Sequence, residues 1–243
     1  MTTPDDARQR PPTSGALADA SGSSTHGLEM DPWLRAAALA GVLTLPLALI
    51  GLTMSDLSGN AGLNPGSPDE EMLSAYADYE GRFWVSASLL AAAAVCTWVF
   101  LGALWTRVRA GSEWLAVVAV LGGCAAGTLL VSWSGMSLVA AVAADYEDVD
   151  TARFLMVAGW ETARLSVGPY LVMVGAATVA GFRYGVFGGK FNWFGLAFTV
   201  LLVFGLVPFS PAGLMGLLAT VWVLVAGLVL AFGRPPAPLR LPA

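Results

Sequence analysis

Charged side chains are scarce in this sequence, and their scarcity excludes most classes of soluble protein. Asp, Glu, Lys and Arg make up only 12% of the 243 residues, about half of the roughly 25% that soluble domains carry. Apolar residues make up 56%, and the mean hydropathy is +0.69. A net charge of -5 also leaves the chain without the basic surface that nucleic-acid binding needs. The composition predicts a protein whose main partner is a lipid bilayer.

Cysteine and histidine are almost absent. Cys96 and Cys124 both lie in apolar runs, which favours two small buried hydrophobes over a disulfide. The single histidine, His26, lies in a polar stretch, so no histidine metal site is expected. The sequence also contains no GxSxG, HExxH, GxGxxG or GxxxxGK[ST] pattern. We therefore expect no enzyme activity, no metal and no cofactor.

Long apolar runs predict an all-α bundle of six transmembrane helices, because a helix needs about 20 residues to cross about 30 Å of hydrocarbon. The fifth run is short and precedes a Pro-containing turn at 209–211, so it either spans fully, as we favour, or is partly re-entrant. Polar segments at 1–32 and 233–243 predict a disordered N-terminal tail and a short C-terminal tail. The predicted spans are about 33–54, 82–105, 114–143, 154–180, 193–208 and 212–232.

The basic residues predict the orientation. Of 12 Lys and Arg residues, nine fall on one side of these spans, two fall on the other, and Arg164 lies within a span. Such a split places the richer side in the cytoplasm, so both termini are expected there. The two on the opposite side are Arg82 and Arg153. The nine are Arg8, Arg10, Arg35, Arg107, Arg109, Arg183, Lys190, Arg234 and Arg240.

A short amphipathic helix is predicted at about 68–80, on the outer surface. Ser67, Pro68 and Glu70 fit the N-cap, N1 and N3 positions of a capping box. Apolar residues then recur near helical spacing, and Gly81 offers a hinge to the second span. We expect this helix to be a connector.

Two charges lie inside the fourth predicted span. Measured from Arg153, Glu161 is about 12 Å and Arg164 about 16 Å along the helix, close to a midplane at about 15 Å. One interpretation is a polar path, with Glu161 as a proton or cation site and Arg164 as its counter-charge. The other, which we favour, is a paired charge that holds this span in register against Ser132, Ser134 and Ser137. The candidate intramembrane polar site is Glu161, Arg164 and Ser134.

Two local features predict how the helices pack. Pro169 should interrupt the fourth span and leave the carbonyl near Leu165 without a donor. Gly123 and Gly127 form a GxxxG pattern in the third span, which allows close helix approach. We expect this pattern to pack within the chain, with contact between two copies as the alternative.

Three segments resemble a group of uncharacterised multi-pass integral membrane proteins of actinobacteria. They are AYADYEGR at 75–82, FLGALW at 100–105 and NWFGL at 192–196. The resemblance covers roughly residues 31–233. It implies a bacterial plasma membrane and brings no assigned activity or catalytic residue.

Three functions remain open at this point. The first, which we favour, is a structural or accessory membrane component that acts through a membrane-protein partner or a second copy. The second is a small transporter or channel using Glu161 and Arg164. A membrane enzyme comes last.

Overall fold

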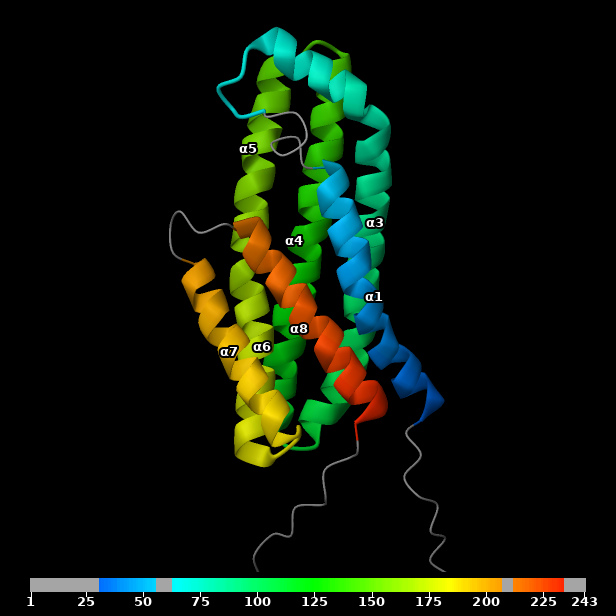
Figure 1. Ribbon diagram of the computed structural model, residues 1–243, viewed down its shortest axis with the longest axis vertical. Helices are drawn as coiled ribbons and strands as arrows, with labels where there is room; N and C mark the ends of the chain where they lie inside the picture. The colour runs from blue at the N-terminus through cyan, green and yellow to red at the C-terminus, as the bar shows by residue number, and fades with distance from the viewer. Residues whose placement is uncertain (1–30, 56–62, 207–211, 234–243) are drawn as a thin grey trace, which may run out of the picture. The chain divides into compact units, whose positions relative to one another are not determined.

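The described residues form an all-α fold, as the sequence predicts (Figure 1). The computed structural model describes residues 31–55, 63–206 and 212–233. The predictions for the tails at 1–30 and 234–243 and for the turn at 209–211 lie outside these ranges. The helices, labelled as in Figure 1, are α1 Pro32–Ser55, α3 Asp69–Arg109, α4 Glu113–Asp145, α5 Val149–Leu165, α6 Val167–Tyr184, α7 Gly189–Gly205 and α8 Ala212–Phe232.

Four helical stretches are long and apolar enough to cross a membrane. They are Pro32–Met54, Asp69–Arg109, Glu113–Asp145 and the α5–α6 run Val149–Tyr184. The segments Gly189–Gly205 and Gly216–Phe232 are apolar but shorter. The sequence prediction of a multi-pass helical protein is therefore supported by four candidate spans and two shorter apolar helices.

Helix α3 joins two segments that the sequence analysis treats separately. The predicted surface helix at 68–80 and the predicted span at 82–105 form one α-helix of 41 residues. Gly81 lies within it, and a side chain there would meet nothing within 4 Å. Figure 1 shows the first turns of α3, in cyan, bending away from the rest of the helix.

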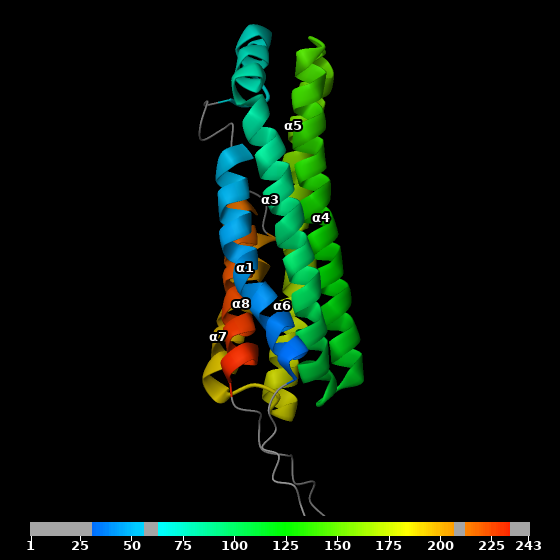
Figure 2. The same ribbon diagram turned by 90° about the vertical axis from the view of Figure 1, so that its right-hand side faces the viewer.

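The helices pack mainly with their neighbours in sequence, and α1 also closes onto α8. Helix α1 lies against α3 and α8, while α4 lies against α3, α5 and α6 (Figure 2). Helix α7 packs against α6 and α8. Ser86 of α3 donates a hydrogen bond to the Gly51 carbonyl of α1 at 2.7 Å. This buried hydrogen bond joins the two helices, together with the close packing of Phe100 on Gly41 and of Leu90 on Gly51.

The GxxxG pattern of α4 packs within the chain. A Cβ on Gly123 would collide with Leu101 of α3, and one on Gly127 would collide with Trp98 of the same helix. Gly122 faces backbone instead of a side chain, because a Cβ there would lie 2.8 Å from the Pro169 carbonyl oxygen of α6. The predicted intramolecular role of this pattern is confirmed.

The first turn of α1 and the last turn of α8 lie at the same end of the bundle (Figure 1). Arg35 lies over the ring of Phe232, 5.0 Å from its centroid. At this end Arg107 also donates from Nε to the Val186 carbonyl at 2.8 Å, which holds the α6–α7 turn against α3. We call this end the basic end. The opposite end, which carries Asp69 and Asp145, is the acidic end.

Candidate functional site

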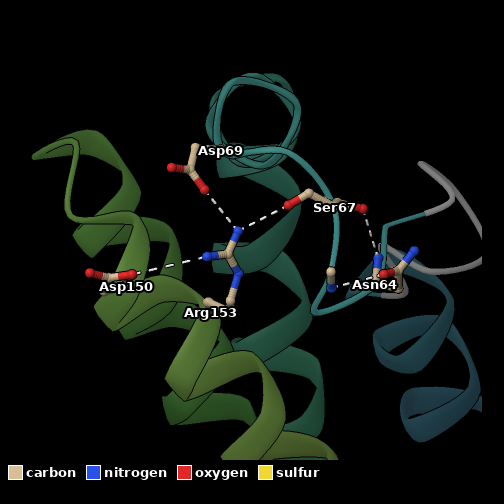
Figure 3. Close-up of polar contacts among 6 residues, drawn as sticks. Asn64, Ser67, Asp69, Asp150 and Arg153 are labelled. Atoms are coloured by element: carbon tan, nitrogen blue, oxygen red, sulfur yellow. Dashed lines mark hydrogen bonds and ion pairs between the residues drawn. The ribbon is translucent and has the colours of Figure 1, made fainter.

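Arg153, in the second turn of α5, ties three segments together at the acidic end (Figure 3). Its Nη2 donates to the Ser67 carbonyl at 2.9 Å and to Oδ1 of Asp69 at 2.9 Å. Its Nη1 lies 4.0 Å from Oδ1 of Asp150 on its own helix. The guanidinium therefore joins the start of α5 to the loop before α3 and to the first turn of α3.

The loop at 63–68 is shaped to present the Ser67 carbonyl to Arg153. Gly66 N–H donates to Oδ1 of Asn64 at 2.8 Å, and Asn64 N–H donates to Oγ of Ser67 at 3.2 Å (Figure 3). The predicted capping box is wrong, because the N-cap of α3 is Pro68 and no side chain caps it. The Ser67 hydroxyl accepts from Asn64 instead, and Met72 N–H bonds the Pro68 carbonyl at 3.0 Å.

A side-chain N-cap is present at the start of α5. Oδ1 of Asp148 accepts from the Thr151 N–H at 3.1 Å, the usual role of an N-cap carboxylate. Hydrogen bonds from the Thr151 side chain and backbone hold the pKa of Asp148 below its usual range. The α4–α5 connection is tight, since Glu147 adopts a φ of 60°.

Beneath Arg153 lies an apolar core that is separate from the main one. Tyr76 and Phe83 of α3 stack in it with ring centroids 5.3 Å apart. Burial raises the pKa of Tyr76 to about 12. We call the ends of α3, α4 and α5 that share this core the extension. Its buried residues are Leu63, Met72, Ala75, Tyr76, Phe83, Ala140, Ala141, Ala144, Ala152 and Met156.

The sequence-predicted pair Glu161 and Arg164 is formed, but it lies on the surface of the chain. Oε1 of Glu161 is 3.6 Å from Nη1 of Arg164, and the two side chains are 61% and 35% exposed. Ser134 is buried, and its hydroxyl donates to the Val131 carbonyl of its own helix at 2.8 Å. Among the hydrogen bonds and ion pairs of these three residues, none links Ser134 to either charge.

The contacts between α4 and α5 differ from the predicted serine contacts. Ser132 and Ser137 donate to carbonyls of their own helix, at 2.9 Å and 3.2 Å. Gly159 instead faces Trp133, and a Cβ on this glycine would lie only 3.0 Å from the indole ring. Thr162 Oγ1 lies 3.6 Å from the sulfur of Met136. Size complementarity thus sets this register.

A small cavity of about 40 Å³ lies beside the break between α5 and α6. Pro169 has no N–H for the Leu165 carbonyl, and the helix breaks at Ser166, as the sequence predicts. Neither Glu161 nor Arg164 lines the cavity. Its walls are Ala48, Leu52, Leu130, Trp133, Ala163, Ser166, Tyr170, Gly216 and Thr220.

Sequence reasoning counted Arg153 only as an outer basic residue and did not find its role. A signal was present, because Arg153 closely follows the acidic stretch at 145–150. Within residues 31–55, 63–206 and 212–233, no group of three His, Cys, Asp or Glu side chains could hold a metal ion.

In comparisons with known proteins, the chain has no significant match to a family model, a curated protein or a solved structure. The resemblance to multi-pass proteins of actinobacteria therefore stays a prediction.

Proposed function

We propose that this chain is a structural or accessory component of a bacterial plasma membrane, without enzyme activity. It crosses the membrane six times with both ends in the cytoplasm, and the extension holds a partner protein on the outer side. Arg35 near the start of α1 contacts Phe232 at the end of α8, so the first and last helices have these ends on the same side. This contact and the six helical passes support an even number of crossings. The excess of basic residues at that end supports the orientation.

The proposal rests on a mismatch of helix lengths. The 36 residues of Val149–Tyr184 are about 54 Å long, and the 41 of α3 are about 61 Å long. A membrane core of about 30 Å holds only some 20 residues of each. Helix α7, with 17 residues, is about 25 Å long and leaves no such excess. Counted from the basic end, the surplus of α3, α4 and α5 is the extension.

This count changes the depth of the charged pair. Twenty residues from Tyr184 reach about Arg164, so the pair lies near the outer boundary rather than at the midplane. The cavity supports this depth for the pair. Ala163, which lies between Glu161 and Arg164 in sequence, lines the cavity together with Leu52, and α1 ends three residues after Leu52, at Ser55. Arg153, taken as the membrane edge in the sequence analysis, then lies well outside.

The exposed surface of the extension favours a role in binding a partner protein over a role as a purely solvent-exposed end of the bundle. Phe154 is 70% exposed, Val139 is 53% exposed and Val142 is 39% exposed. In the proposed placement these side chains face water or headgroups, where exposed apolar groups mark contact sites more often than in lipid. A rigid core and the Arg153 contacts support them.

The geometry favours this function over a transporter. A transport site needs its charges inside the bundle, whereas Glu161 is 61% exposed at the side-chain level and lies outside the small cavity. The accessory role therefore accounts for the pair with fewer assumptions.

Photocrosslinking in native membranes tests the proposal. A photoreactive amino acid at Phe154 should give one discrete protein adduct, identified by mass spectrometry and absent at Val172, a 45% exposed position on α6. Identical patterns at the two positions, or no protein adduct at Phe154, would contradict it.

A further inference from the structure

Three buried polar atoms without hydrogen-bond partners lie along the contact of α6, α7 and α8. They are Oγ1 of Thr178, Oδ1 of Asn192 and Nε1 of Trp222. Their residues are only 6%, 7% and 0% exposed. Buried polar atoms nearly always have a partner, and leaving one unpaired is costly. Three such atoms on three helices therefore need a common explanation.

Two glycines bring these atoms onto one seam. Nε1 of Trp222 lies 3.5 Å from the position that a Cβ on Gly195 would occupy, and Oγ1 of Thr178 lies against the same position. Oδ1 of Asn192 lies in the same way against Gly181. Residues three apart share a helix face, so Thr178 and Gly181 of α6 oppose Asn192 and Gly195 of α7.

We infer that this seam, formed by Thr178, Gly181, Asn192, Gly195 and Trp222, is a binding site for water. An indole N–H only donates, an amide oxygen only accepts, and a hydroxyl does both. This mixture matches a small neutral molecule that also donates and accepts, and it matches neither a cation nor an anion. Water accepts from Trp222 and donates to Thr178 or Asn192.

Gly181 and Gly195 have no side chain, which allows the neighbouring helices to pack closely along the seam. A Cβ on Gly195 would overlap the Thr178 hydroxyl and lie 3.5 Å from Nε1 of Trp222, so a glycine here lets both polar groups approach the α7 backbone. Buried waters typically make about three hydrogen bonds to otherwise unpaired groups. The seam offers partners from three helices, so bound water joins α7 to α6 and α8.

Hydroxyl-radical labelling of the full chain in nanodiscs tests the site, because radicals formed from bound water mark the side chains that touch it. Met173 of α6 is the matched control, since it is also 0% exposed and is readily oxidised. We expect Trp222 to be labelled several-fold faster than Met173, and Thr178→Val to bring Trp222 down towards Met173. Equal protection of Trp222 and Met173 in the unmodified protein would overturn the inference.

Thermal stability gives an independent sign. If water bridges the seam, Thr178→Val strands the water and its other partners, and Tm falls. If the seam is dry, the same change removes an unpaired hydroxyl, and Tm rises. Thr199→Val is the control, because that hydroxyl donates to the Gly195 carbonyl of its own helix at 2.8 Å. A Thr178→Val protein more stable than Thr199→Val would refute the water site.

Discussion

Nη2 of Arg153 on α5 lies 2.9 Å from Oδ1 of Asp69 on α3, across 84 residues of chain. The same nitrogen also donates to the Ser67 carbonyl. One side chain therefore closes the extension, where α3, α4 and α5 run on beyond the other helices.

Replacing Arg153 should loosen the extension. We expect Arg153→Gln to lower the free energy of unfolding by about 1–2 kcal/mol, since hydrogen bonds to charged groups are strong but Asp69 is largely exposed. Hydrogen exchange should rise in residues 63–80. Arg109→Gln is the control, because its pair with Glu113 is 3.8 Å long and exposed on both sides. Equal effects of the two changes would contradict a special role for Arg153.

The close approach of α4 and α6 should make Gly122 intolerant of even a methyl group. Gly122→Ala should cost about 1–3 kcal/mol, because its Cβ would meet backbone atoms of α6. On the same helix, Gly135→Ala should be neutral or stabilising by up to about 1 kcal/mol, since nothing lies within 4 Å there. Denaturation in mild detergent measures both, and a similar cost at the two positions would disprove the packing account.

Neutralising Glu161 should have little effect. An exposed i,i+3 pair contributes about 0.5 kcal/mol or less, so Glu161→Gln should leave stability and proteoliposome permeability to protons and sodium ions nearly unchanged. Arg164→Leu should likewise leave both stability and permeability nearly unchanged. A large loss of a protein-dependent flux in either variant would instead favour the transporter.

Alkaline pH should destabilise the extension through Tyr76. Burial raises its pKa from 10.0 to about 12 in the folded chain. The neutral phenol is therefore favoured by folding, and this stabilising contribution is complete below pH 10 and is lost as the pH rises towards 12. Tyr76→Phe keeps the stacked ring and should flatten the fall in stability across that range. An unchanged alkaline profile in Tyr76→Phe would show that another group is responsible.

Single cysteines should report opposite sides of the membrane. With Cys96 and Cys124 replaced, Gly66→Cys should react with an impermeant maleimide added to intact cells. Gly188→Cys should react only after the cells are opened. Both glycines are exposed in the structure. Labelling of both positions from outside would reject the proposed topology.

Local sequence signals were sufficient for the helical class, for the break at Ser166 and for the intramolecular use of Gly123 and Gly127. Each depends on a property carried along one helix: the length of an apolar run, the missing N–H of Pro169, or the small size of glycine. The predicted capping box is not formed, because the Ser67 hydroxyl accepts a hydrogen bond from the Asn64 N–H instead of capping α3.

The pattern of charges and apolar runs thus indicated what kind of protein this is and where its helices lie. It could not indicate that Arg153 reaches Ser67, or that Thr178, Asn192 and Trp222 lie along one contact between helices. Those contacts depend on how far neighbouring helices extend past one another and on how each helix is rotated about its axis. Both are determined jointly by many side chains that are far apart in sequence. Helix formation is a local property of the chain, whereas the partner of a charge or a buried hydroxyl depends on packing between segments far apart in sequence.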